Sequence, residues 1–561
     1  MLHDDVMRID RMTRRLSSAH RSTRFGLDCR SALGEASPGA SIAYRRCTAE
    51  KGAWALIGDP DWTDRMDKRG LDPLGMQNAG VALYQSLLPG ISNVTLRMRY
   101  YGYYCWVSDA YARSGASDEF AAWRSWVRRA EAIYALVSSS ATGQVGVGGV
   151  EWADRRLALK EDVIDFAEAA SNEAGVVRYL RQSLGVFGGA YYSQMVDMGL
   201  FRRGEHGIQR ATNGVGLETA SAFRTSIGPA VEALLLTSIS SARVARADLS
   251  RLAAIVPSAI PDVQYERSCY ERLLFVPAET NDRDASRAAS LRLILITAQA
   301  LGCRPNGDMV RWHLFAAAPL AAADLERQRI RWEAYQCQDL MQIAAASLLD
   351  WSTELMGEFD SGRTPAEIGA EVQARLLVSA AEAGCKADVS WASLRADLDP
   401  DEFDYRGAAA RLISRRGTAE GKAWDAIRLM AALDGRVASR PELSQVATRE
   451  FKPQGPARSV TTELAWLGQH ADRSIHEVIA SFVVERVVRR HSWVAMQKLR
   501  RQRDYTFLFD SRDGRLVRRS GYPPVPTNPR LGPAIQFLED IGLIGRAGVT
   551  ERALSLIGAT K

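Results

Sequence analysis

Apolar side chains at helical spacing define the first two predicted helices. The first is indicated by a run of four such residues, Val81, Tyr84, Leu87 and Leu88. The Pro89–Gly90 pair breaks this helix. Ser92 or Asn93 can then cap a second helix over residues 95–112.

The predicted helix over residues 95–112 carries aromatic residues on nearly every side. They are Tyr100, Tyr101, Tyr103, Tyr104, Trp106 and Tyr111. Rings all round a helix indicate burial against several neighbours. The same rings, with Arg97 and Arg99 at the helix start, also suit stacking on nucleic-acid bases. We favour the packed core helix.

The pattern over residues 225–480 is also mainly helical. Residues 324–349 form a long amphipathic candidate, with apolar side chains at helix-compatible spacing. At 561 residues the chain is too long for one hydrophobic core. The expected fold class is therefore mainly α, in a multidomain helical protein.

Two stretches combine a helix, a glycine, a polar hairpin-like loop and another helix. The first runs through residues 198–223, and the second runs through residues 533–557. In a winged helix, the apolar residues after the glycine begin a strand and the loop forms the wing. The order predicts one or two winged-helix-like (α+β) modules, with the second matching the pattern better.

These patterns suggest five segments along the chain. They are a mobile basic tail over 1–50, an N-terminal helical domain over 51–194, a winged-helix-like element over 195–240, a central helical domain over 241–480 and a basic winged-helix-like module over 481–561.

Composition narrows the class of protein. The apolar share is 46% and the charged share 25%, both ordinary for a globular protein. The seven cysteines are scattered and form no CxxC pair, which favours a reducing compartment. No apolar run approaches the roughly 18–20 residues that span a bilayer. We therefore expect a cytoplasmic protein with no membrane partner.

Positive charge is concentrated near the C-terminus. Residues 481–530 hold twelve Lys or Arg against four Asp or Glu, a net charge of +8, whereas the whole chain carries only +6. A strand over 505–510, a turn over 511–514 and a return strand over 515–519 make this block a charged hairpin beside a charged helix. The candidate nucleic-acid contacts are Arg489, Arg490, Lys498, Arg500, Arg501, Arg503, Arg515, Arg518, Arg519 and Arg530.

A charged helix beside a charged hairpin can grip two phosphate backbones. DNA is the partner that we expect. Arginines also form solvated surface and internal ion pairs, so a protein-docking face and a face without a partner remain alternatives.

No motif assigns catalytic residues, a metal site or a cofactor. The glycine-rich stretch 143–149 has no following lysine, so it is not a phosphate-binding loop. The acidic stretch 397–404 departs from the EF-hand pattern, which leaves an acidic helix N-terminus as its interpretation. The residues around Asp262 and Glu266 approach a nuclease motif, but Ser268 stands where the lysine is expected.

Two stretches resemble uncharacterised bacterial proteins found in mobile-element or phage-defence gene clusters. They are LLPGISNVTLRMRYYGYYCWV (87–107) and HSWVAMQKLRRQRDYTFLF (491–509). The resemblance implies a role in genome defence, with protein partners encoded nearby, and it carries no catalytic residues.

Together with the basic block, the resemblance favours a non-catalytic, DNA-binding subunit of a bacterial antiviral defence or DNA-processing complex. One alternative is a helical scaffold whose basic face docks an acidic protein. A third hypothesis is a metal-dependent nuclease built from scattered carboxylates.

Overall fold

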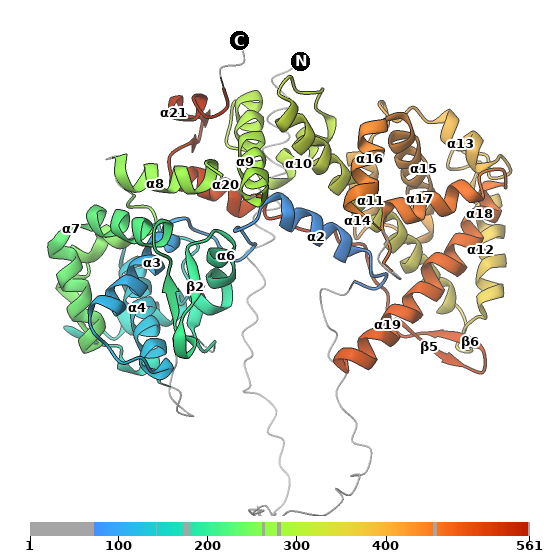
Figure 1. The fold of residues 1–561 in the computed structure, drawn as a ribbon. Helices are drawn as coiled ribbons and strands as arrows, with labels where there is room; N and C mark the ends of the chain where they lie inside the picture. Colours follow the sequence, from blue (N-terminus) through green and yellow to red (C-terminus); the bar gives the residue numbers. More distant parts are fainter. Residues whose placement is uncertain are drawn as a thin grey trace, which may run out of the picture. The chain divides into compact units, whose positions relative to one another are not determined.

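The computed structural model describes residues 72–141, 143–171, 179–180, 182–260, 264–277, 282–452 and 457–558. The described part of the chain is mainly helical, as the apolar periodicity predicts (Figure 1). The described residues, from 72 onward, belong to one compact unit. The expected tail over 1–50 lies outside the described residues, and the proposed domain boundaries stay predictions.

The first half of the described chain contains helices, one short hairpin (β2–β3) and a second antiparallel strand pair (β1–β4). Its elements are α2 (Gln77–Leu87), α3 (Arg99–Arg113), α4 (Phe120–Ser140), α5 (Val150–Ala158), β1 (Val163–Asp165), η1 (Ala167–Ala170), η2 (Phe187–Tyr191), α6 (Tyr192–Asp197), β2 (Phe201–Arg203), η3 (Glu205–Gly207), β3 (Gln209–Ala211), α7 (Val215–Ser241), β4 (Arg243–Ala245), η4 (Arg246–Asp248), η5 (Arg251–Ile255) and α8 (Gln264–Phe275).

The second half is built around one long helix, α11. Its elements are α9 (Asp282–Leu301), α10 (Gly307–Ala316), α11 (Ala323–Met356), α12 (Pro365–Ser379), α13 (Trp391–Asp397), α14 (Tyr405–Ile413), η6 (Glu420–Lys422), α15 (Ala423–Ser439), α16 (Pro441–Glu450), α17 (Val460–Gln469), α18 (Ile475–Phe482), η7 (Val483–Val488), α19 (Arg489–Gln502), β5 (Phe509–Arg512), β6 (Arg515–Arg518), α20 (Leu531–Asp540), β7 (Ile544–Gly545), β8 (Gly548–Val549) and α21 (Glu551–Leu554).

The helix α11 is buried on all sides from Trp332 to Leu349, so the expected polar face is absent there, whereas Asp324 and Arg327 in its first turns are exposed. Its polar side chains bond to other elements: the Gln338 amide donates to the Met76 carbonyl at 2.9 Å and accepts from the Val460 N–H at 2.6 Å. The amphipathic expectation was wrong because periodicity does not distinguish a solvated polar residue from one that bonds inside the core.

The aromatic helix α3 is a core helix, as favoured from its sequence. Its six rings are 2% exposed or less, so none of them is available to stack on a nucleic-acid base. At its start, Arg99 forms a fully buried ion pair with Glu266, with Nη2 and Oε2 3.0 Å apart. The neighbouring Arg97 pairs with Asp540, which joins α3 to α20.

The strands form four separate antiparallel pairs, β1–β4, β2–β3, β5–β6 and β7–β8. Helix–hairpin–helix order does occur at both predicted places, around β2–β3 and β7–β8. Each described sheet there is only a two-stranded hairpin of two or three residues per strand, so the winged-helix modules are not confirmed.

Candidate nucleic-acid interface

The helix α19 forms one wall of the candidate site. Its inward face is buried through His491, Val494 and Ala495, and Arg503 ends it in the left-handed conformation with φ 56°. The hairpin β5–β6 follows, and its turn contains Gly514 with φ 76°, as expected for a tight hairpin turn. The helix α19 lies beside this hairpin in Figure 1, and its first turn makes the contact, with the His491 ring centroid 5.1 Å from that of Phe509.

A groove of about 740 Å³ lies between α19, the segment around the start of α2 and the end of α16. Its lining includes five cationic residues, Lys452, Arg458, Arg490, Lys498 and Arg501. The two carboxylates in the lining are outnumbered by these cations, although the charge of Asp72 attracts Lys498 and Arg490. Asp72 accepts the Met76 and Gln77 N–H groups, both at 3.0 Å, and Glu450 pairs with Arg331 at 2.9 Å. The groove therefore holds an excess of positive charge.

The positive charges in the groove repel one another. Burial, reinforced by the charge of Arg458, lowers the pKa of Arg490 to about 10. Burial also lowers the pKa of Arg458, with a further contribution from Arg486. The Nε atom of Arg458 is buried and has no hydrogen-bond partner among the described residues. An anion bound between these groups would relieve the repulsion.

Three side chains of α19 hold the segment before α2 against the groove. Arg490 Nε donates to the Leu74 carbonyl at 2.8 Å, and Lys498 Nζ donates to the Asp72 carbonyl at 2.9 Å. His491 Nε2 accepts the Leu508 N–H at 2.9 Å, so Nδ1 carries the proton and donates to the Pro73 carbonyl at 3.1 Å. The histidine therefore joins both the groove and the hairpin to α19.

Gly75 permits the close approach of Arg490. Its φ is +68°, and an added Cβ would lie 2.7 Å from the Arg490 Nη2 atom. A side chain at this position would meet both backbone strain and the arginine that lines the groove.

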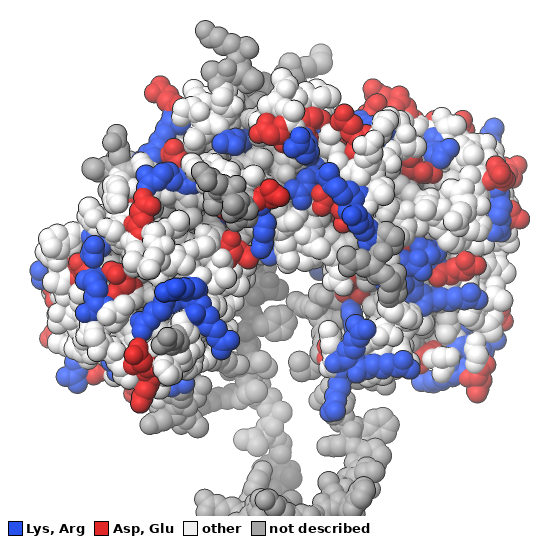
Figure 2. Space-filling model, in the orientation of Figure 1, with Lys and Arg blue, Asp and Glu red and all other residues white. Residues whose placement is uncertain are grey.

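The structure divides the ten predicted contacts into three groups. Arg490, Lys498 and Arg501 line the groove. Exposed side chains without an ion pair to another described residue are Arg489, Arg500, Arg501, Arg503 and Arg518. Figure 2 shows Lys and Arg gathered over the end of α19 and the β5–β6 hairpin. The groove and the end of α19 together form one basic surface.

The other three predicted contacts bond within the protein. Arg515 pairs with Glu367 at 2.9 Å, and Arg519 lies 3.5 Å from the Asp510 carboxylate. Arg530 donates to the Ile91 carbonyl at 2.6 Å. These guanidinium groups have acceptors within the protein and lie outside the groove lining, so they are weaker candidates for phosphate contacts.

Three groove residues escaped the prediction from sequence. Lys452 and Arg458 lie outside the basic block, and nothing in their neighbourhood marks them as members of a site. Trp493 lies inside the block but reads as an ordinary apolar position of a helix. Only the long-range packing of α19 against residues 72–82 brings them together.

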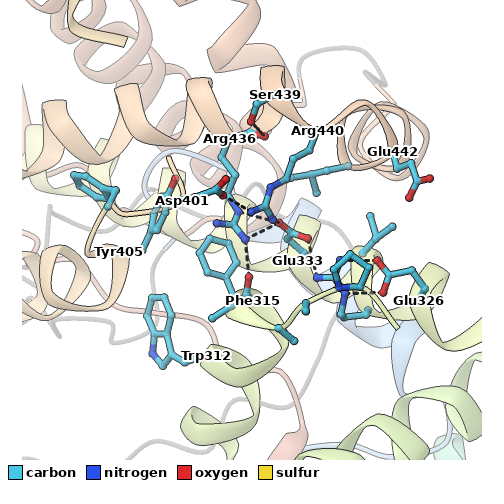
Figure 3. A pocket seen from close by; sticks show the side chains of 18 of the residues that line it. Trp312, Phe315, Glu326, Glu333, Asp401, Tyr405, Arg436, Ser439, Arg440 and Glu442 are labelled. Atoms are coloured by element: carbon cyan, nitrogen blue, oxygen red, sulfur yellow. Dashed lines mark hydrogen bonds and ion pairs between the residues drawn. The ribbon is translucent and has the colours of Figure 1, made fainter. Parts of the chain in front are cut away.

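A larger cavity of about 980 Å³ lies elsewhere in the second half of the chain, lined by α10, α11, α14, α15 and the start of α16 (Figure 3). Glu333 Oε1 lies 2.7 Å from Arg436, and its Oε2 lies 3.0 Å from Arg329. Arg440 bridges Glu333 and Asp401.

Aromatic rings that line the larger cavity contact arginines of the same cavity. The Arg436 guanidinium lies 3.9 Å from the Phe315 ring centroid. Its lining holds four arginines and five carboxylates, and its buried charges satisfy one another. The larger cavity is therefore a weaker candidate than the groove for binding an ion.

The described residues contain no group of three His, Cys, Asp or Glu side chains placed to hold a metal ion. In the acidic stretch 397–404, Asp404 caps α14 by accepting the Gly407 N–H at 2.8 Å. No helix among the described residues is long and apolar enough to cross a membrane.

Comparison with protein-family models, curated proteins and solved structures finds no match to this chain. The functional argument therefore rests on the basic surface.

Proposed function

We propose that this protein binds nucleic acid through backbone phosphates and acts as a non-catalytic subunit of a bacterial antiviral defence or DNA-processing complex. The observation that carries the proposal is the groove, where five cations face only two carboxylates. Phosphate oxygens supply the negative charge that this site lacks.

The exposed arginines extend the same surface. Arg500, Arg501 and Arg503 follow one another at the end of α19, and none pairs with a carboxylate of the described residues. A backbone that enters the groove at Arg458 can continue over this end of the helix. Contacts of this kind position a nucleic acid without reading its sequence.

The proposal is tested by titrating the full chain with fluorescent oligonucleotides at several salt concentrations. Replacing Arg500, Arg501 and Arg503 with Gln removes three cations from the surface. Binding should weaken for every sequence, and the slope of log K against log salt should flatten by about 2 to 3, given roughly 0.7–0.9 per phosphate contact.

A matched control removes charge from a different hairpin. Arg202 and Arg203 of β2 are exposed, and changing both to Gln should leave the affinity and the salt slope nearly unchanged. Unaltered binding in the Arg500, Arg501 and Arg503 variant would contradict the proposal. Failure of the unmodified chain to bind any nucleic acid, combined with capture of an acidic protein encoded nearby, would favour the docking scaffold instead.

A further inference from the structure

Trp493 distinguishes the groove from an ordinary basic surface. It lines the groove, and 40% of its side-chain surface is exposed. Among the described residues it is the tryptophan with the greatest exposure, and the other described tryptophans are buried or partly buried. An exposed indole ring surrounded by cations is a common platform for a nucleic-acid base.

The position of Trp493 on α19 directs it along the groove. Trp493, Gln497 and Arg501 are four residues apart, so they follow one face of the helix, and all three line the groove. Arg490 lies 4.5 Å from the indole centroid and supports the ring through a cation–π contact. A base stacked on the indole would extend this arginine–ring pair.

A second exposed ring follows the end of α19. Tyr505 is 54% exposed, and the Arg519 guanidinium lies 4.3 Å from its ring centroid. The Tyr505 hydroxyl donates to Asp510 at 2.7 Å, which fixes the ring against the hairpin. The exposed arginines 500, 501 and 503 lie between the two rings in sequence.

The groove also carries neutral polar side chains. They are Gln77, Asn78, Gln497 and Gln502. Amide groups can donate to and accept from the edges of an unpaired base. A groove of about 740 Å³ lies within the size range of small-molecule pockets and suits one or two nucleotides.

We propose that the groove binds single-stranded nucleic acid, with one base stacked on Trp493 and the backbone passing Arg458, Lys498 and Arg501. This inference rests on the proposed function and names its substrate class. Bases inside a duplex are stacked on each other and cannot reach the indole, so an unpaired strand is the form that uses both the ring and the cations.

The test compares labelled single strands of thymidine and uridine nucleotides with a duplex of equal length, using fluorescence anisotropy and the full chain. Trp493→Leu keeps an apolar side chain but removes the ring, whereas Trp493→Phe keeps a ring. The Leu variant should bind either single strand about tenfold or more weakly, the Phe variant should lose less, and duplex affinity should be unchanged by either. The two single strands report whether DNA or RNA is preferred.

Two further variants keep the test decisive. Tyr265→Leu removes an exposed ring of α8 and should leave affinity unchanged, since this ring is 45% exposed but lies outside the groove lining. Tyr505→Leu tests the second ring if the Trp493 variants unfold, and it should weaken single-strand binding.

Duplex binding as tight as single-strand binding, with no effect of removing either ring, would overturn the inference and leave the proposed function standing. Absence of binding to every nucleic acid would overturn both.

Discussion

Lowering the pH should loosen the junction that His491 makes between α19, the groove and the hairpin. The imidazole is 1% exposed, donates from Nδ1 to the Pro73 carbonyl and accepts the Leu508 N–H at Nε2. Burial lowers its pKa to about 4. A second proton would have to replace the Nε2 lone pair that accepts from Leu508, so protonation breaks this hydrogen bond.

The size of the effect follows from two pKa values. The unfolded chain has the ordinary histidine pKa near 6.5 and therefore binds more protons than the folded chain between pH 6.5 and 4. Stability from this group is complete above pH 6.5 and is lost as the pH falls. Between pH 7.5 and pH 5 the loss is about 2 kcal/mol, worked from a folded pKa of about 4.

The titration of Glu131 affects stability in the opposite direction to that of His491, so the pH dependence of the unmodified chain alone does not report on His491. Burial raises the pKa of this carboxyl to about 7, so its contribution to stability grows as the pH falls through 7. Over the same interval this gain is also about 2 kcal/mol, with the opposite sign to the loss at His491. The contributions of His491 and Glu131 therefore nearly cancel between pH 7.5 and pH 5.

The assay is urea unfolding of the unmodified chain and of His491→Gln at pH 7.5 and pH 5. Glu131 contributes equally to both chains and cancels from their difference. The variant should be less stable at pH 7.5, and the gap should shrink by about 2 kcal/mol at pH 5. His206→Gln, at an exposed histidine, serves as the control. A gap of the same size at both pH values would refute the assignment of His491 as a buried neutral acceptor.

Two further substitutions test the packing of the two cavities. Gly75→Ala should lower the free energy of unfolding by about 1–3 kcal/mol, because it strains the backbone, and should weaken nucleic-acid binding, because it displaces Arg490. The control is Gly115→Ala, where φ is +63° and the surrounding space is open. This variant should show the loss of stability without a binding defect. Glu333→Gln should lower the free energy of unfolding by about 3–5 kcal/mol in urea titration, since it leaves buried arginines without a counter-charge. Glu442→Gln, on the exposed rim of the same cavity, should change it by under about 1 kcal/mol. Equal effects of the two substitutions would contradict the buried ion-pair network.

Local signals predicted the local features well. The helix α2 ends at Leu87, just before the predicted break at Pro89–Gly90, because this signal is short-range. The hairpin loop was predicted over 511–514, and the observed turn is narrower, with Asp513 and Gly514 in the left-handed conformation between β5 and β6. The first strand was placed too early: residues 505–508 lie ahead of β5, and Leu508 bonds to the His491 side chain.

The sequence predicted only the part of the candidate site that is formed by residues close together in the chain. The density of arginines marks the end of α19, but the sequence could not reveal that Arg530 and Arg515 bond internally or that Arg458 joins the groove. Those roles depend on segments that lie tens to hundreds of residues away, and no periodic pattern records such contacts.

The groove has a consequence for the order of events during synthesis. One wall begins at Asp72, and the opposite wall ends at Gln502. At roughly 5–20 residues per second, a ribosome needs on the order of 20–90 s to extend the chain from the first wall to the second. During this time the first wall lacks Arg490, His491 and Lys498. The nascent chain therefore acquires its basic groove only once α19 has been synthesised, and a product that stops before α19 lacks it entirely.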